Sequence, residues 1–209
     1  MTPETVSLQA LDGVTLEADV IRVDSDSPRA FVVIAHPHPA YGGDRHNHVV
    51  RAIQQAAHAL GCHSVAPDFR GAGGSMGFHD DGVSERLDIA AACELASFVC
   101  EDAPIIIAGY SFGAAVALNV THPAAIGWLA VAPPAAMLSP SPVAAGSHLP
   151  KSVLVPEHDQ FAPVRAIGEA TGDWRNISVT VLDGADHFLA AGAEDAVLSA
   201  LSGLLGSAS

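Results

Sequence analysis

The chain has 209 residues, 49% of them hydrophobic, which suits a single domain over residues 1–209 with one sizeable core and excludes a disordered protein. Its formal net charge of −14 at pH 7 argues against a basic groove, so we expect no nucleic-acid partner. No run of about 18 apolar residues is present, so we expect no membrane-spanning helix and no membrane partner.

Two features of the sequence bear on the cellular compartment. The N-terminal stretch MTPETVSLQALDG lacks the basic start and the apolar run of a signal peptide. The three cysteines, Cys62, Cys93 and Cys100, are odd in number and have no CxxC spacing, so we interpret them as free core thiols. Both features favour a cytoplasmic protein.

Short apolar runs rich in β-branched residues predict the strands. The first two runs, residues 5–10 and 14–23, alternate in polarity as half-exposed antiparallel strands do. The later runs are more continuously apolar, which is typical of buried parallel strands. They cover residues 30–37, 63–69, 104–110, 127–134, 152–158 and 177–183.

Helical patterns occupy most of the segments between these runs. They cover residues 47–60, 82–100, 112–122, 163–172 and 194–205. In the second helix, Leu87, Ala91, Leu95 and Phe98 fall on one side. Strands that alternate with helices predict an α/β fold, with a mainly parallel sheet and helices on both faces. The loop from Pro133 to Pro150 is too short for an inserted cap domain, so we expect an open active-site mouth.

The segment Gly109-Tyr110-Ser111-Phe112-Gly113 joins an apolar run to an alanine-rich helix. Ligands bind beyond the carboxyl ends of parallel strands, and Ser111 lies at such an end. A sharp strand-to-helix turn brings backbones close together, which explains a glycine two positions to each side of the serine. The pattern predicts a nucleophilic serine. The alternative is an ordinary turn in which Ser111 caps the helix.

A serine nucleophile needs a base and a group that orients the base. Four histidines lie downstream of the serine: His122, His148, His158 and His187. We favour His187, because it follows the last predicted strand and should lie at the same sheet edge as Ser111. For the orienting acid we favour Asp159, which follows a strand and precedes a helix. Three other carboxylates are alternatives: Glu157, Asp183 and Asp186.

Acyl transfer also needs two N–H groups aimed at the developing oxyanion. The first is expected from Phe112, the residue after the nucleophile. The second is expected from the loop after the third strand, in which Pro37 and Pro39 have no N–H to offer. Of the two histidines in this HPHP segment, His38 is better placed than His36.

Two motifs could indicate a metal site and a nucleotide site, but we favour neither interpretation. The histidines at positions 36, 38, 46 and 48 are interrupted by prolines and lack a completing carboxylate pair, so we expect no metal. The glycine-rich FRGAGGSMG is not followed by GK[ST], so we expect it to shape a loop beside the active site and not to bind a nucleotide.

Five segments together resemble the α/β-hydrolase superfamily. They are HPHPAYGGDRHNHVV, DFRGAGGSMG, GYSFGAAVAL, PEHDQFAPV and GADHF, and they span Phe31 to about Phe188. The chain is most similar to small lidless serine hydrolases with an HPHPxxGG oxyanion loop, of the dienelactone-hydrolase or carboxylesterase kind. The resemblance implies an eight-stranded sheet, a triad of Ser111, Asp159 and His187, and ester or thioester hydrolysis without a cofactor.

We therefore expect a carboxylesterase-type serine hydrolase whose substrate is a small molecule, an ester of a small or medium acyl group. The alternatives are a thioesterase or peptidase with the same triad, and a non-catalytic binding protein on a hydrolase fold. The apolar lining of the substrate site is expected from Tyr41, Phe69, Met137 and Phe161. The sequence gives no basis for predicting the oligomeric state.

Overall fold

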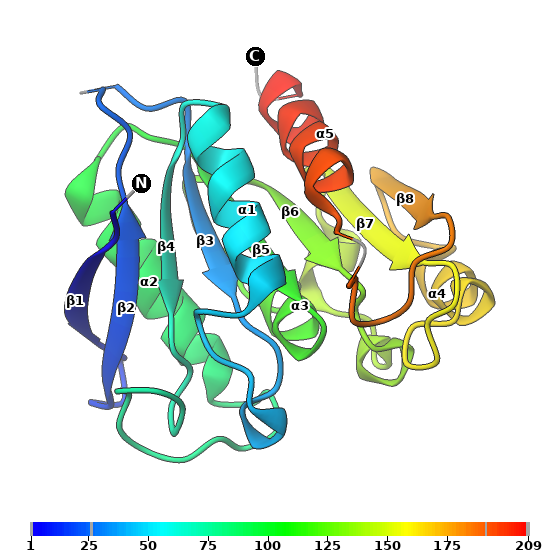
Figure 1. Cartoon of the computed structure of the whole chain (residues 1–209), viewed down its shortest axis with the longest axis horizontal. Coiled ribbons are helices and arrows are strands. Elements are labelled where there is room, and N and C mark those ends of the chain that lie inside the picture. Colours follow the sequence, from blue (N-terminus) through cyan, green and yellow to red (C-terminus); the bar gives the residue numbers. More distant parts are fainter. Residues whose placement is uncertain (1, 26, 191, 208–209) are drawn as a thin grey trace.

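The computed structural model describes residues 2–25, 27–190 and 192–207, and these build one eight-stranded sheet with helices on both faces (Figure 1). The strands are β1 (Glu4–Gln9), β2 (Thr15–Ile21), β3 (Phe31–Ala35), β4 (His63–Pro67), β5 (Ile105–Tyr110), β6 (Ala125–Val131), β7 (Lys151–Pro156) and β8 (Ile177–Leu182). Their order across the sheet is β1-β2-β4-β3-β5-β6-β7-β8. Only the β1–β2 and β2–β4 pairs are antiparallel, which confirms the predicted α/β fold with a mostly parallel sheet.

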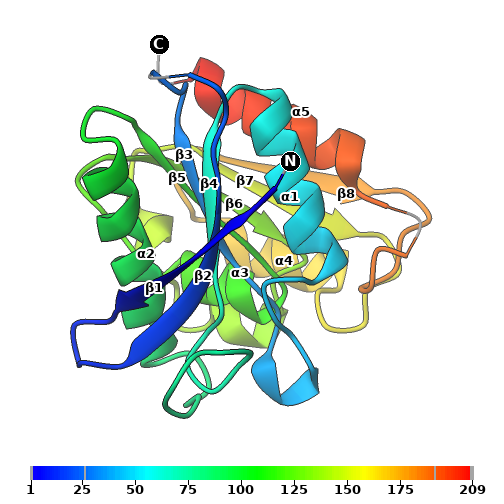
Figure 2. The ribbon, with the colours of Figure 1, turned by 60° about the vertical axis from the view of Figure 1, so that its left-hand side comes forward.

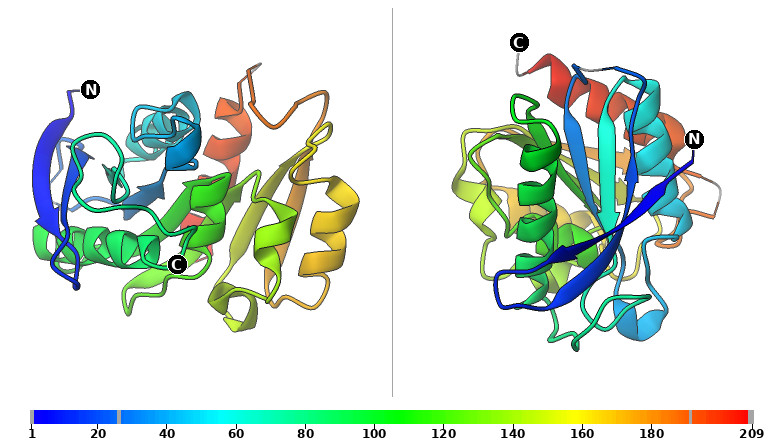
Figure 3. Two further views of the ribbon diagram at one scale, coloured as in Figure 1. Left: turned by 90° about the horizontal axis from the view of Figure 1, so that it is seen from below. Right: turned by 90° about the vertical axis from the view of Figure 1, so that its left-hand side faces the viewer.

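The helices divide between the two faces of the sheet. They are α1 (His48–Ala59), α2 (Glu85–Val99), α3 (Phe112–Ala117), α4 (Val164–Thr171) and α5 (Glu194–Gly206), with short 3-10 turns η1 (Pro39–Tyr41), η2 (Ala135–Leu138) and η3 (Val143–Gly146). Figures 2 and 3 show α1 and α5 on one face and α2 on the other. Core contacts place α3 and α4 on the α2 face.

The two faces explain why β3, β5 and β6 are apolar along almost their whole length. In β5, Ile105 and Ile107 pack in the core layer beneath α2 and α3, whereas Ile106 packs in the layer beneath α1 and α5. Successive side chains of a strand point to opposite faces, so a strand covered on both sides must be apolar throughout. The site described below lies at the carboxyl ends of β3, β5, β7 and β8.

One strand does not follow this rule. Residues 177–183 are predicted as a buried strand, but β8 lies at the edge of the sheet and most of its residues are exposed. Its alternate residues Ser178 and Thr180 are polar, which fits a strand without a covering helix on that side.

Two helices also differ from expectation. The predicted helix 112–122 ends at Ala117, since β-branched residues follow and Pro123 disfavours the helical conformation at His122. In α2 the most deeply buried apolar residues are Ile89, Ala92, Cys93 and Ala96. Phe98 is 88% exposed, so the predicted apolar face of this helix is wrong in part.

Three smaller expectations can be compared with the structure. All three cysteines are free, but only Cys62 and Cys93 are buried, and Cys100 at the end of α2 is half-buried. The loop from Pro133 to Pro150 contains only η2 and η3, as a chain without an inserted cap requires. Within the described residues, no helix combines the length and apolarity that crossing a bilayer requires.

Candidate active site

Ser111 occupies the sharp turn between β5 and α3. Its backbone φ of 53° and ψ of −122° is a conformation that few residues other than glycine adopt. A Cβ at Gly109 would lie 2.4 Å from the carbonyl oxygen of Gly113, and a Cβ at Gly113 would lie 2.3 Å from that of His36. Both glycines are therefore required by close backbone contacts, which confirms the steric reason predicted for them.

A chain of hydrogen bonds connects Ser111 to His187 and Asp159. The Oγ of Ser111 lies 3.0 Å from Nε2 of His187, and Nδ1 of His187 lies 2.7 Å from Oδ2 of Asp159. With the imidazole neutral and its proton on Nδ1, the ring donates to the carboxylate and accepts from the serine hydroxyl. The structure thus brings together the three side chains that the sequence singled out from separate loops.

Asp159 is itself held in place by backbone donors. Its Oδ1 accepts from the N–H of Phe161 at 2.7 Å and from the N–H of Ala162 at 2.9 Å, and its side chain is fully buried. These bonds stabilise the carboxylate and leave Oδ2 free to face the imidazole. The acid and its turn therefore form a rigid unit at the end of β7.

None of the alternative residues contacts the serine or the imidazole nitrogens. Asp186 caps its own turn by accepting from Phe188 and Leu189 N–H groups, and Glu157 accepts from the N–H of Gly184. Asp183 is exposed at the end of β8. The remaining downstream histidines have other neighbours: Glu94 for His122, Arg175 for His148 and Glu157 for His158.

The loop carrying His187 is held by a residue that the sequence did not single out for this role. The hydroxyl of Tyr110 donates to the carbonyl oxygen of His187 at 2.8 Å. Burial, together with the nearby carboxylates Asp159 and Asp186, raises the pKa of Tyr110 to about 12, so the phenol stays a donor at every physiological pH. The position of Tyr110 before the nucleophile was visible in the sequence, but its contact with a loop 77 residues away was not.

Two residues beside Ser111 have backbone N–H groups without a partner among the described residues. Among the described residues, neither the N–H of His38 nor that of Phe112 donates to another group, and both residues line the cavity beside Ser111. Such unpaired donors beside a nucleophile can receive an oxyanion. These are the two residues that the sequence analysis named as oxyanion donors.

His36 orients the peptide that carries the His38 N–H. Its Nε2 accepts from the N–H of Phe69 at 2.8 Å, so its proton sits on Nδ1, which lies 2.6 Å from the carbonyl oxygen of Pro37. Desolvation by burial lowers the pKa of His36 to about 4, which keeps the ring neutral. In a trans peptide the C=O and N–H point in opposite directions, so holding the Pro37 carbonyl also directs the His38 N–H.

Buried ion pairs fasten this loop to the sheet. Asp68, at the end of β4, accepts from both the backbone N–H and the guanidinium of Arg45. The same guanidinium lies 3.1 Å from Asp19 and 2.6 Å from Glu17 on β2. A Cβ at Gly73 would overlap the Asp68 carboxylate at 1.8 Å. The glycine-rich segment therefore wraps around a charged cluster that supports the oxyanion loop.

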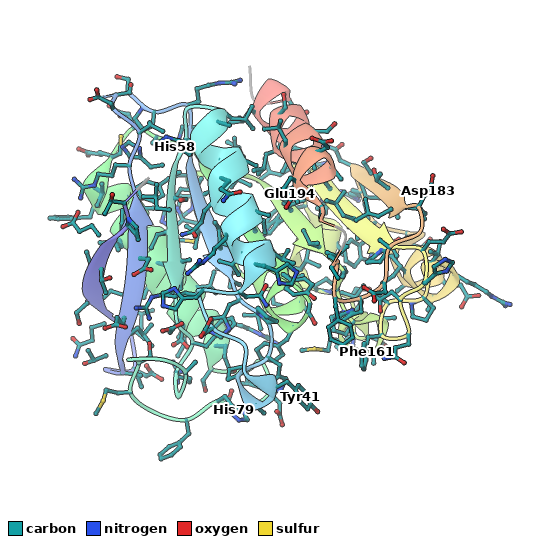
Figure 4. All side chains as sticks on the ribbon, in the orientation of Figure 1. Tyr41, His58, His79, Phe161, Asp183 and Glu194 are labelled. Atoms are coloured by element: carbon teal, nitrogen blue, oxygen red, sulfur yellow. The ribbon has the colours of Figure 1, made fainter. Side chains whose placement is uncertain are left out.

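A cavity of about 480 Å³ opens at Ser111. The expected lining residues Tyr41, Met137 and Phe161 do line it. Figure 4 shows Tyr41 and Phe161 near the lower edge of the molecule, and both are largely exposed. Phe69, in contrast, is fully buried between His36 and Phe112, so its prediction as a lining residue is wrong.

Other lining residues were missed. Phe188 and Asn47 both contribute to the cavity wall. Phe188 follows His187 directly, and an aromatic residue beside a proposed base was a usable signal. Asn47 caps α1 through its side chain, a role that gave no hint of the cavity.

Of the four histidines that suggested a metal in the sequence, only His38 belongs to a group that could hold one. Both nitrogens of His36 are engaged, and His48 lies 2.9 Å from the carbonyl of Phe188. Among the described residues, one group, His38, His79 and Asp81, brings three ligand atoms within 4.8 Å of one another. Because Nδ1 of His38 accepts from the N–H of Ala40, the Nε2 facing Asp81 carries the proton in the neutral ring. A His–carboxylate contact fits this geometry better than a metal site.

Comparison with known proteins agrees with the observed fold. Residues 31–145 match the model of the alpha/beta hydrolase family, and the chain belongs to this family. A relative, an uncharacterised protein of Rickettsia prowazekii (strain Madrid E), is 29% identical over 180 residues, which are 78% of this chain and 73% of the relative.

Solved structures extend the likeness to almost the whole chain. An alpha-beta serine hydrolase homologue from Coxiella burnetii has a TM-score of 0.81 and 28% identity, covering 98% of this chain and 96% of its own. A serine hydrolase without a lid from Xanthomonas campestris has a TM-score of 0.84 and 23% identity, and the match covers 99% of this chain and 94% of that protein. Family, fold and site together support a hydrolase function.

Proposed function

We propose that this protein is a serine carboxylesterase that cleaves neutral esters of small or medium acyl groups. The observation that carries the proposal is the hydrogen-bonded chain Ser111–His187–Asp159, with the unpaired N–H groups of His38 and Phe112 beside it. The relationship to the serine hydrolase homologue from Coxiella burnetii supports the same chemistry.

In the first half-reaction, Ser111 Oγ attacks the ester carbonyl while Nε2 of His187 takes the hydroxyl proton. The carbonyl electrons move to its oxygen, which receives hydrogen bonds from the N–H groups of Phe112 and His38. Asp159 keeps the imidazole in the correct tautomer and stabilises the imidazolium. His187 then gives its proton to the departing alkoxide, which leaves an acyl-enzyme and a free alcohol.

In the second half-reaction, water attacks the acyl-enzyme and His187 takes its proton. The tetrahedral intermediate collapses, Ser111 leaves with the proton returned by His187, and the carboxylic acid is released. The cavity suits this substrate class, because its walls are mainly aromatic and aliphatic and its volume of about 480 Å³ fits a small ligand. The net charge of −14 disfavours anionic esters.

We place this activity in the cytoplasm. The three free cysteines fit a reducing compartment, in which thiols are not oxidised to disulfides.

The test is a panel of p-nitrophenyl esters from acetate to octanoate. We expect turnover of the shorter esters and its loss in Ser111→Ala, whereas Ser202→Ala, on an exposed face of α5, keeps wild-type activity. A fluorophosphonate probe should label the wild type and not Ser111→Ala. Preferential turnover of acyl thioesters or aminoacyl anilides would reassign the enzyme to a thioesterase or peptidase. Folded protein that is neither labelled nor active would point to a binding protein.

A further inference from the structure

A polar side chain that the proposed mechanism does not use lies in the wall of the cavity at Ser111. Asn47 contributes to this wall and is half-buried just before α1. Its Oδ1 accepts from the N–H of Val49 at 2.9 Å and so caps the helix. Because only the amide oxygen can accept this bond, Nδ2 is a donor of fixed position. Within the described part of the chain, no group accepts a hydrogen bond from Nδ2.

Apart from the nucleophile and the base, the other polar side chains of the wall have partners or are open to solvent. Tyr110 donates to the loop that carries the base, and His38 contacts Asp81. Tyr41 is 88% exposed, so water can satisfy its hydroxyl. The half-buried amide of Asn47 is thus the donor for which a bound substrate offers the best acceptor.

The electrostatics of the wall favour a neutral acceptor. Among the described residues that line the cavity, none is a lysine or an arginine. The chain as a whole has a net charge of −14, which disfavours an anion at the mouth. A neutral amide donor with no cation beside it suits an ether, hydroxyl or carbonyl oxygen.

The loop that carries the base brings Asn47 to the side of the leaving alcohol. His187 must reach the alkoxide to protonate it, so the alcohol portion of an ester lies on the His187 side of the cavity. Phe188 also lines the cavity, and its carbonyl oxygen lies 2.9 Å from Nε2 of His48 in the first turn of α1. This bond joins the base loop to the helix that Asn47 caps. Asn47 and the alcohol portion therefore share one side of the cavity.

We propose that Asn47 determines specificity for the alcohol portion of the substrate by donating from Nδ2 to a neutral oxygen close to the ester group. The preferred substrates are then esters of alkoxy- or hydroxy-alcohols, and esters of plain alkyl alcohols are poorer ones. This role rests on the proposed esterase activity, because it concerns a part of the same substrate. Asn47 adds specificity and no chemical step, since proton transfer and oxyanion binding stay with the residues already described.

Two esters with the same number of heavy atoms test this role. They are 2-methoxyethyl butyrate and butyl butyrate, which differ by an ether oxygen in place of one methylene. The ratio of their kcat/KM values should favour the methoxyethyl ester in the wild type. It should fall by about three- to tenfold in Asn47→Ser and Asn47→Asp, as expected for one neutral hydrogen bond. The inductive effect of the ether oxygen is the same in all variants and does not change the comparison.

Both substitutions separate recognition from helix capping. Serine and aspartate are good N-caps, but the serine hydroxyl is too short to replace Nδ2 and the carboxylate has no donor. A merely structural role of Asn47 would therefore leave the ratio unchanged. Melting temperatures close to that of the wild type verify that the cap is kept.

Two controls locate the effect. Tyr41→Phe removes the exposed hydroxyl of the wall and should keep the wild-type ratio. Ethyl 3-ethoxypropanoate and ethyl hexanoate form the matched pair for the acyl portion, and their ratio should not respond to the Asn47 substitutions. A wild-type ratio in both Asn47 variants, or a fall confined to the acyl pair, overturns the role of Asn47 and leaves the esterase proposal standing. A wild type that cleaves none of these esters and no p-nitrophenyl ester overturns both.

Discussion

Removing the hydroxyl of Tyr110 tests whether the loop carrying His187 is positioned from β5. Tyr110→Phe keeps the ring, which lies 5.8 Å from the His187 imidazole, and deletes only the 2.8 Å bond to the His187 carbonyl. Tyr110 is 3% exposed, so water cannot replace the lost donor without rearrangement. The variant therefore isolates a single hydrogen bond.

The expected effects can be estimated from this burial. A buried carbonyl without its donor costs about 1–3 kcal/mol, which lowers the melting temperature of a domain of this size by about 2–12 °C. Loss of the bond also lets the imidazole drift from Ser111 Oγ, and small misplacements of a catalytic group are costly. We expect kcat to fall by about tenfold with little change in KM.

The assay pairs differential scanning calorimetry with p-nitrophenyl butyrate kinetics. Tyr41→Phe is the matched control for stability, because Tyr41 is the other tyrosine and is 88% exposed. Since the pKa of Tyr110 is about 12, the difference between the variant and the wild type should be constant from pH 6 to about pH 9. Unchanged melting temperature and unchanged kcat would refute the positioning role.

Three further predictions concern the acid and the oxyanion loop. Asp159→Asn should lower kcat by about 10³–10⁴, measured with the same ester, because the amide favours the wrong imidazole tautomer. The pKa of His36 is lowered from 6.5 to about 4, so the free energy of unfolding should fall by up to about 3 kcal/mol as the pH drops from 6.5 to 4. Denaturant titrations at several pH values should show a smaller fall in His36→Gln. Gly43→Ala should lower both kcat and melting temperature, since its Cβ would lie 2.1 Å from the Pro37 carbonyl, whereas Gly146→Ala, with open space around it, should change neither. Wild-type kcat in Asp159→Asn or in Gly43→Ala would contradict the role given to that residue. For His36, the contradicting result is a stability that depends on pH in His36→Gln as it does in the wild type.

The candidate site could be predicted to a large extent because its signals are local. A serine flanked by glycines after an apolar run, an aspartate after β7 and a histidine after β8 each lie at the carboxyl end of a parallel strand. Parallel strands bring those ends to one edge whatever the details of packing, so residues 111, 159 and 187 could be placed together from chain order alone. The prolines of the HPHP segment likewise left few candidates for the second oxyanion donor.

Contacts between distant segments could not be predicted in this way. Phe69 looked like a lining residue because it follows a strand, yet it is enclosed by His36 and Phe112. The apolar stripe chosen for α2 included Phe98, which lies four residues after the exposed Glu94 on the solvent side of the helix, although Val99 next to it still packs against the core. The bond from Tyr110 to His187 and the cavity position of Asn47 depend on where two loops approach each other.

The sequence by itself determined the α/β architecture and the identity of the triad candidates, because periodicity, glycine sterics and proline chemistry act over a few residues. The tertiary structure alone decided which aromatic residues face the cavity, which histidine orients the oxyanion peptide and that β8 keeps a free edge. These outcomes depend on the burial and the orientation of side chains from separate segments, and only the packed fold specifies them.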